Sequence, residues 1–205
     1  MNLHDLGMKY NTDKAHYHNF CKLYDEHLQK YKNLELNFME IGVLDGSSLK
    51  MWYEYFTRSK IYGVDIYDKS YLNNDRIETI IANQENEIEL GNLPKNLDII
   101  LDDGGHTMIQ QQVTFKIMFN NHLKSEGVYV LEDLHTSNSR YYNSHGSNPK
   151  NNTLNLLYDI KSGKIRDKSQ YYISNIEFEE LCENIYSIDI YEIGEDSITS
   201  LIKKK

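Results

Sequence analysis

Two acidic clusters, each containing a histidine, carry the residue types in this sequence that could do chemistry. Residues 102–106 read Asp-Asp-Gly-Gly-His, and residues 132–135 read Glu-Asp-Leu-His. Each cluster follows an apolar run typical of a β-strand, at residues 97–101 and 128–131. If both runs are parallel strands of one sheet, the clusters meet at its carboxyl edge, where α/β proteins build their sites. Several carboxylate oxygens would then converge on one hard cation such as Mg²⁺.

A more common role also fits these acidic residues. Asp102, Asp103, Glu132 and Asp133 could cap the helices that follow, or lie solvated at strand ends. For one cluster alone we favour that role, whereas two matching clusters after neighbouring strands favour a metal site. Thiolate ligands are not indicated, because the two cysteines lie in unrelated segments without CxxC spacing.

The elements that must position the clusters follow an alternating pattern of strands and helices. The strands predicted in this part of the chain are residues 37–43, 60–66, 77–82, 97–101 and 128–131. A helix is predicted at residues 47–58, and a longer one contains Ile109, Val113 and Ile117 on its inner side. This alternation is typical of a mostly parallel sheet with helices on both faces.

The two ends of the chain add helices and a hairpin. The apolar spacing predicts an N-terminal helix at residues 15–32. Residues 137–152 are polar and lack an apolar period, so we expect a long loop over the site, of the kind that forms lids. A helix is predicted at residues 153–161, and strands at 185–193 and 198–202 would form an antiparallel hairpin at one sheet edge.

The whole pattern predicts an α/β fold that is Rossmann-like and doubly wound. We expect a mostly parallel seven-stranded sheet with an antiparallel edge hairpin and an N-terminal helical segment. A chain of 205 residues, 40% of them hydrophobic, can bury one good core. A single domain over residues 1–205 is therefore expected, with residues 1–35 as a helical cap and residues 36–205 as the core.

Composition and charge exclude several classes of function. The net charge of −9 opposes nucleic-acid binding, because Lys and Arg drive contacts with phosphate. The first residues lack the basic start and apolar core of a signal peptide, and no apolar run approaches membrane-spanning length. We expect a cytoplasmic protein with no membrane span and no nucleic-acid partner, and the sequence leaves a homo-oligomer open.

A strand-to-helix turn around Gly42 indicates a nucleoside site. Gly42 would let a ligand approach the backbone closely, and Gly46 with Ser47 would open the next helix with its amide donors facing the crevice. The following strand ends at Asp65, which is suited to holding ribose hydroxyls. A structural glycine and a strand-end aspartate also occur in βαβ units that bind nothing. The turn is neither a Gly-x-Gly-x-x-Gly fingerprint nor a P-loop.

Five short motifs, spread over most of the chain, are shared with one enzyme family. They are residues 10–14 (Tyr-Asn-Thr-Asp-Lys), 39–43 (Met-Glu-Ile-Gly-Val), 62–66 (Tyr-Gly-Val-Asp-Ile), 102–106 and 131–137 (Leu-Glu-Asp-Leu-His-Thr-Ser). In these motifs the chain resembles class I S-adenosylmethionine-dependent methyltransferases, specifically the metal-dependent sugar O-methyltransferases of macrolide and bacterial polysaccharide pathways. It departs at Asn11, where the family often has Gly, and at Gly105, where Ser is commoner. Residues 137–152 match poorly, and there we expect the acceptor to be chosen.

The resemblance implies a set of contacts with S-adenosylmethionine. Glu40 and Gly42 would line its methionine and ribose portions, and Asp65 would accept hydrogen bonds from the ribose hydroxyls. Gln84 would lie beside the adenine, and Asp102 under the sulfonium or its amino group. The full set implied for the cofactor is Tyr10, Thr12, Glu40, Gly42, Asp65, Gln84 and Asp102, with Tyr10 and Thr12 as a cap. Asp13 and Lys14 could instead form a local ion pair that starts the first helix.

The resemblance also implies the catalytic groups. Asp103, Glu132 and Asp133 look like ligands of Mg²⁺ or another divalent cation, and His106 looks like the general base. A sugar hydroxyl is a very weak acid, so a cation that stabilises the developing alkoxide and a base that takes its proton would both assist methyl transfer. His135 could contact the acceptor or lie at the surface.

The expected function is therefore Mg²⁺-dependent methylation of a hydroxyl on a sugar or sugar conjugate, in surface-polysaccharide or natural-product biosynthesis. Two alternatives stay open: a metal-dependent hydroxylase-like relative on the same fold, and a non-catalytic sugar-binding or scaffold protein. A NAD-dependent dehydrogenase lacks its glycine fingerprint here.

Overall fold

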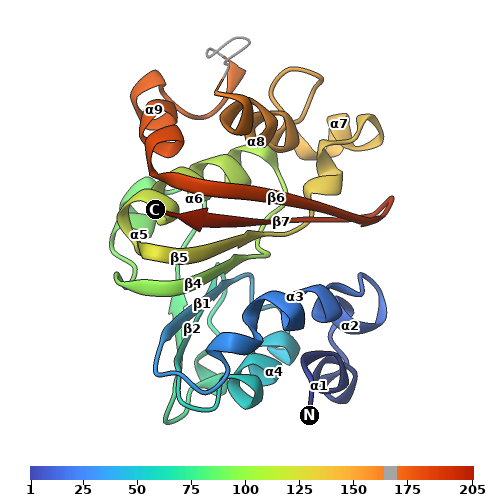
Figure 1. The fold of residues 1–205 in the computed structure, drawn as a ribbon, viewed down its shortest axis with the longest axis vertical. Coiled ribbons are helices and arrows are strands. Elements are labelled where there is room, and N and C mark those ends of the chain that lie inside the picture. Colours follow the sequence, from blue (N-terminus) through green and yellow to red (C-terminus); the bar gives the residue numbers. More distant parts are fainter. Residues whose placement is uncertain (164–169) are drawn as a thin grey trace.

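The computed structural model describes residues 1–163 and 170–205, which form a seven-stranded sheet covered by helices on both faces (Figure 1). The strands are β1 (Asn37–Ile41), β2 (Lys60–Asp65), β3 (Ile77–Ile81), β4 (Leu97–Asp102), β5 (Leu123–Leu131), β6 (Ile185–Gly194) and β7 (Ser197–Lys204). Their order is β3-β2-β1-β4-β5-β7-β6. The first five are parallel, and β7 runs antiparallel to both β5 and β6. The predicted sheet with its antiparallel edge hairpin is confirmed.

The helices form two layers, one on each face of the sheet (Figure 1). One layer contains α1 (Leu3–Tyr10), α2 (Asp13–His16), α3 (Phe20–Leu28) and α4 (Ser47–Tyr55). The other contains α5 (Glu87–Gly91), α6 (Met108–Asn121), α8 (Thr153–Ser162) and α9 (Asn175–Asn184). No helix within the described residues has the length and apolar character needed to cross a membrane.

Each layer of helices packs against its own hydrophobic core, and the strands contribute alternate residues to the two cores. In β1, Phe38 belongs to the core under α1–α4 and Met39 to the core under the other helices. In β5, Val130 belongs to the core under α1–α4 and Leu131 to the core under the other helices. This period of two means that consecutive residues at a strand end point to opposite faces of the sheet. It therefore determines which face each carboxylate at the carboxyl ends of β4 and β5 points to.

The N-terminal segment is helical, but it is not the single helix predicted over residues 15–32. α2 ends at His16, and α3 begins at Phe20 after Asn19, which has a left-handed backbone conformation with φ of 58°. A short 3₁₀ helix, η1 (Gln29–Tyr31), follows α3. The apolar spacing of Phe20, Tyr24 and Leu28 does mark the buried side of α3, but it says nothing of the break that lets α2 turn toward the sheet edge.

Residues 137–152 contain helical turns where a long structureless loop was expected. They begin within η3 (Leu134–Ser137) and include η4 (Ser139–Tyr141) and α7 (Tyr142–His145). Turns of three or four residues are too short to show an apolar period, so the sequence pattern could not reveal them. The role of this segment as a lid, and the division into a cap and a core, stay predictions.

Candidate active site

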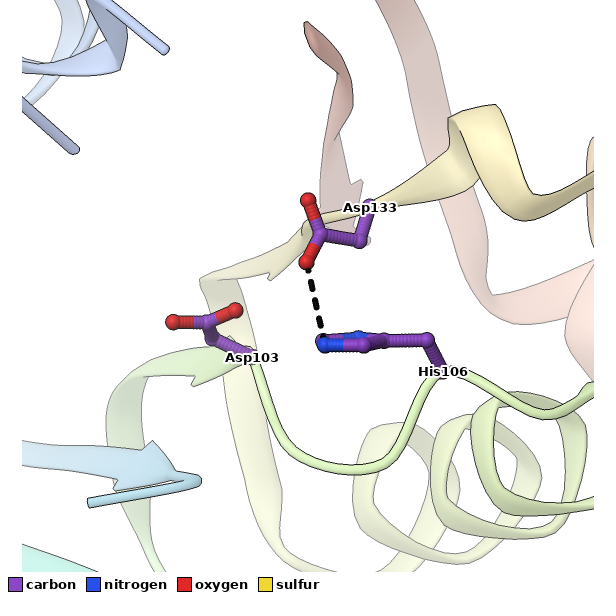
Figure 2. A group of neighbouring side chains, drawn as sticks. All are labelled: Asp103, His106 and Asp133. Atoms are coloured by element: carbon purple, nitrogen blue, oxygen red, sulfur yellow. Dashed lines mark ion pairs between the residues drawn. The ribbon is translucent and has the colours of Figure 1, made fainter. Parts of the chain in front are cut away.

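Asp103, His106 and Asp133 lie together at the carboxyl edge of the sheet (Figure 2). Asp103 directly follows β4 and Asp133 lies just beyond β5, while His106 comes from the loop before α6. One ligand atom from each side chain can be chosen so that all three lie within 4.8 Å of one another. His106 Nε2 is 3.2 Å from Asp133 Oδ2. The structure therefore brings together residues from both acidic clusters.

Backbone hydrogen bonds hold these strand ends in register. The amide of Asp103 donates to the carbonyl of Ile41 at 2.8 Å, and the amide of Glu132 donates to the carbonyl of Asp102 at 3.0 Å. Gly42 has a left-handed backbone, with φ of +90°, and lies against the backbone of Asp103 and Gly104. A Cβ on Gly42 would be 1.9 Å from the Asp103 carbonyl oxygen. Only glycine fits there, so Gly42 is needed for the close approach of the two loops.

The loop that carries His106 ends in a fixed helix start. Thr107 caps α6: its Oγ1 accepts a hydrogen bond from the Gln110 amide at 3.3 Å, and its own amide donates to Gln110 Oε1 at 3.2 Å. This reciprocal capping box satisfies two amides that would otherwise lack partners. His106 is thereby attached to a rigid element on one side, while its side chain stays 35% exposed and open to a ligand.

Asp133 has features typical of a residue that binds a ligand. Its backbone is left-handed, with φ of 55°, a conformation that is rare for a residue with a side chain. Its Oδ1 is buried and has no hydrogen-bond partner among the described residues. His135 Nδ1 lies 3.5 Å from this oxygen. An unpartnered buried carboxylate oxygen is costly unless a cation or water satisfies it.

Glu132 is not a member of this group, and its partners lie on the side covered by α1–α4. Its Oε1 accepts a hydrogen bond from the Tyr24 hydroxyl at 2.9 Å, and its Oε2 accepts one from Lys14 Nζ at 3.0 Å. Lys14 also donates to Asp103 Oδ2 and lies 3.9 Å from Glu40 Oε1. Among the described ion pairs, those of Lys14 are with these three carboxylates and not with Asp13.

The buried charges around Lys14 shift one another's protonation. Burial alone would lower the pKa of Lys14, but Asp103, Glu132 and Glu40 outweigh burial and raise it well above its ordinary value. Lys14 therefore stays protonated. Burial raises the pKa of Asp103 and of Glu132, and the ammonium of Lys14 opposes this rise in both. Three carboxylates thus share one lysine.

A pocket of about 480 Å³ opens beside Asp103, His106 and Asp133. It runs along the carboxyl ends of β1, β2 and β4, which is where a parallel sheet of this type binds nucleotides. The predicted site residues that line it are Thr12, Gly42, Asp65, Gln84, Asp103, His106 and Asp133. The remaining ones, Tyr10, Glu40, Asp102 and Glu132, are not among its described lining residues. Their direct contacts with a cofactor or a metal stay predictions.

Asp65 holds the glycine turn in shape. Its Oδ2 accepts hydrogen bonds from the amides of Val43 and Leu44, both at 3.1 Å, and its Oδ1 accepts one from the Tyr67 amide at 2.9 Å. The carboxylate therefore faces the pocket with its position already fixed by three backbone donors. Such a group can accept hydrogen bonds from ligand hydroxyls without first having to be ordered.

Glu40 and Asp102 are buried carboxyl groups with internal partners. Glu40 accepts hydrogen bonds from Ser48 Oγ and Trp52 Nε1, and Asp102 accepts them from Gln84 Nε2 and Tyr129 Oη. Burial raises the pKa of each to about 7, although their hydrogen bonds, and Lys14 in the case of Glu40, counteract it.

Gln84 and Tyr10, both predicted to contact the cofactor, have protein partners in the structure. Gln84 also accepts a hydrogen bond from the Gly105 amide, so it connects Asp102 to the loop of His106. Tyr10 donates to Glu54 Oε2 at 2.6 Å. Lys14 and Tyr24 were not predicted as site residues. Lys14 does lie in the shared motif at residues 10–14, which is the one signal that could have pointed to it.

Comparison with known proteins identifies the relatives of this chain. No family model matches it. Demethylmacrocin O-methyltransferase of Streptomyces fradiae is 35% identical over 173 residues, which are 78% of this chain and 43% of that protein. An 8-demethyl-8-alpha-L-rhamnosyl tetracenomycin-C 2'-O-methyltransferase of Streptomyces olivaceus is 34% identical over 142 residues, 64% of this chain and 37% of that protein. The chain thus spans less than half the length of these relatives.

A solved structure extends the similarity to the whole chain. The MycE methyltransferase of the mycinamycin biosynthetic pathway, determined in complex with Mg, SAH and mycinamycin VI, superposes with a TM-score of 0.81 and 28% sequence identity. The match covers 100% of this chain and 54% of MycE. The chain is therefore a homologue of the sugar O-methyltransferases and has the fold of class I S-adenosylmethionine-dependent methyltransferases.

Proposed function

We propose that this chain is a Mg²⁺-dependent O-methyltransferase that transfers the methyl group of S-adenosylmethionine to a hydroxyl of a sugar or sugar conjugate. The observation that carries the proposal is the meeting of Asp103, His106 and Asp133 at the rim of the pocket. MycE, which shares the fold over the full length of this chain, was determined with Mg and SAH. The matched segments cover less than half of the curated relatives and 54% of MycE, so the activity of the whole relatives is proposed for this chain and is not shown by the similarity.

The donor set fits a hard divalent cation. Asp103 and Asp133 offer carboxylate oxygens, the ligands that Mg²⁺ prefers, and the buried Oδ1 of Asp133 lacks another partner among the described residues. A cation held there supplies Lewis acidity, which stabilises negative charge on the acceptor oxygen during methyl transfer. Glu132 would join as a ligand if it exchanged one of its present hydrogen bonds, with Tyr24 or Lys14.

The chain's own residues supply orientation and proton transfer. Thr12, Gly42, Asp65 and Gln84 line the part of the pocket proposed for the nucleoside. As the methyl group passes from the sulfonium sulfur to the acceptor oxygen, the hydroxyl proton moves to a ring nitrogen of His106. Asp133 Oδ2, 3.2 Å from Nε2, accepts a hydrogen bond from the protonated imidazole and stabilises its charge. S-adenosylhomocysteine then leaves with the electron pair of the broken bond.

The acceptor is proposed from the relatives. One is named for a rhamnosyl substituent and a 2'-oxygen, which supports a sugar hydroxyl as the acceptor group. The relatives named above act on natural-product glycosides by name, so a role in surface-polysaccharide biosynthesis stays a prediction without support from them.

The variant Asp103→Ala tests the proposal. We expect calorimetry to show S-adenosylhomocysteine binding close to that of the wild type, and methyl transfer to rhamnosyl glycosides to collapse. Excess chelator should have the same effect on the wild type. Asp98→Asn is the matched control. Asp98 also belongs to β4, but it is 25% exposed, pairs with Lys124 and does not line the pocket. Turnover that survives both Asp103→Ala and chelator would remove the metal from the mechanism. A wild type that does not bind S-adenosylhomocysteine would instead favour a scaffold protein.

A further inference from the structure

Lys14 is a buried cation at the site, and the proposed reaction gives it no task. Its side chain is 1% exposed, although it lies on the short helix α2 near the N-terminus. Its Nζ contacts Asp103 Oδ2 after β4, Glu132 Oε2 after β5 and, at 3.9 Å, Glu40 Oε1 in β1. β1, β4 and β5 are neighbours in the sheet. Lys14 therefore gathers the carboxylates of three adjacent strands onto one ammonium group.

Two of the three residues proposed as metal ligands are partners of this lysine. Lys14 contacts one oxygen of Asp103, and Lys14 and Tyr24 together bond both oxygens of Glu132. The third, Asp133, has its described contacts with His106 and His135 instead. A divalent cation on Asp103 thus shares the carboxylate with an ammonium, and one on Glu132 needs an oxygen that Lys14 or Tyr24 already holds.

We propose that Lys14 is a built-in counter-cation that competes with the divalent ion for Asp103 and Glu132 and thereby lowers the metal affinity of the site. The inference rests on the proposed function, because it concerns the same metal. An ammonium and a divalent cation that share carboxylates repel each other, and burial reduces the screening of that repulsion. An ammonium left alone in the interior would be costly, so Lys14 needs a second partner when the cation enters. Glu40 is in place to be that partner.

Lys14→Met tests this proposal by removing the charge while keeping a side chain of similar length. We expect Mg²⁺, measured by calorimetry, and Mn²⁺, measured by electron paramagnetic resonance, to bind at least about tenfold more tightly than in the wild type. A factor of ten corresponds to about 1.4 kcal/mol, less than the repulsion between nearby, poorly screened charges. Lys14→Arg keeps the charge and should show no such gain.

Lys116→Met is the matched control. Lys116 is also largely buried between two carboxylates, those of Glu87 and Glu177 at 2.8 and 2.9 Å, but it lies outside the pocket lining. Its loss should leave metal affinity unchanged. In addition, Mg²⁺ should raise the Tm of Lys14→Met by more than it raises the Tm of the wild type or of Lys116→Met, because ligand stabilisation grows with affinity.

The outcomes separate this inference from the proposed function. If the wild type binds Mg²⁺ and folded Lys14→Met binds it equally or more weakly, the role proposed for Lys14 is overturned and the proposed function is not. Absence of binding in every variant overturns both. If Lys14→Met does not fold, Lys14→Gln keeps a hydrogen-bond donor without the charge and is expected to bind more tightly.

Discussion

Glu40 offers the most direct measure of the electrostatics at the carboxyl edge. Its side chain is fully buried, and its two oxygens accept hydrogen bonds from Ser48 Oγ at 2.9 Å and Trp52 Nε1 at 3.2 Å. Glu40→Gln keeps the shape of the side chain. The Gln carbonyl can still accept from Trp52, and its amide can donate to the Ser48 hydroxyl. The substitution therefore removes the titration of this group with little loss of packing.

The size of the effect follows from the pKa. Burial, opposed by Lys14, raises the pKa of Glu40 from 4.5 to about 7. Between these values the folded protein binds the proton more tightly than the unfolded chain, so the free energy of unfolding falls as pH rises and levels off above about pH 7. At roughly 1.4 kcal/mol per pH unit, the wild type should lose about 2 to 3 kcal/mol from this group between about pH 5 and pH 8. Glu40→Gln should not show this loss.

Urea unfolding of both proteins at several pH values provides the measurement. The difference in unfolding free energy, variant minus wild type, should rise by about 2 to 3 kcal/mol from about pH 5 to pH 8. Glu54→Gln is the control. Hydrogen bonds from Lys9 and Tyr10 lower the pKa of Glu54, so its titration lies below that window and its difference should stay flat. Parallel stability curves for wild type and Glu40→Gln would refute the argument, because they would mean that Glu40 does not titrate with a raised pKa.

Three further substitutions probe the site, and a fourth, Gly91→Ala, is the control for Gly42→Ala. His106→Ala should lower turnover by about 10²- to 10⁴-fold, the usual contribution of a general base. Calorimetry should find S-adenosylhomocysteine binding unchanged, and an equal loss of binding would contradict the assigned role. Gly42→Ala should lower the free energy of unfolding by about 3 kcal/mol or more, because its backbone is left-handed and its Cβ would clash with Asp103. Gly91→Ala, with nothing within 4 Å, should change stability by at most about 1 kcal/mol in the same urea titration. Asp65→Ala should weaken S-adenosylhomocysteine binding by about 10- to 100-fold, the value of a hydrogen bond to a charged group, and wild-type affinity would exclude the ribose contact.

The sheet could be predicted from the sequence because its strands are apolar and its helices periodic, but the end of β1 and the start of β5 could not. β1 was predicted to reach residue 43, yet it ends at Ile41, since Gly42 turns the chain with φ of +90°. β5 was predicted from residue 128, yet it begins at Leu123. Its first half, Lys-Ser-Glu-Gly after Leu123, has no apolar side chain, and Ser125 and Glu126 are exposed, so it carries no apolar signal.

The site was only partly predictable, because its buried members depend on partners far away in the chain. The meeting of residues 103, 106 and 133 follows from parallel strands that end at one edge, and motif and topology both indicate it. Lys14, in contrast, lies 89 residues from Asp103 and 118 residues from Glu132. Its burial also depends on the break between α2 and α3 at Asn19, which the apolar spacing of α3 does not reveal.

Strand alternation explains why the two acidic residues of each cluster, Asp102 with Asp103 and Glu132 with Asp133, have different surroundings. Successive residues at a strand end point to opposite faces, so a pair of carboxylates cannot occupy one environment. Asp102 faces the α6 side and bonds with Tyr129 and Gln84, and Glu132 faces the α1–α4 side and bonds with Tyr24 and Lys14.

Asp103 and Asp133 follow these two residues directly, and both line the pocket. The buried member of each pair needs internal donors, because an unpaired buried carboxylate would destabilise the fold. The pocket member keeps capacity for a ligand: Asp133 Oδ1 is buried without a hydrogen-bond partner among the described residues, whereas Asp103 is also contacted by Lys14. The two acidic clusters therefore have similar sequences but unequal sites: Asp133 of the second presents an unpartnered carboxylate oxygen, and Asp103 of the first shares its carboxylate with a lysine.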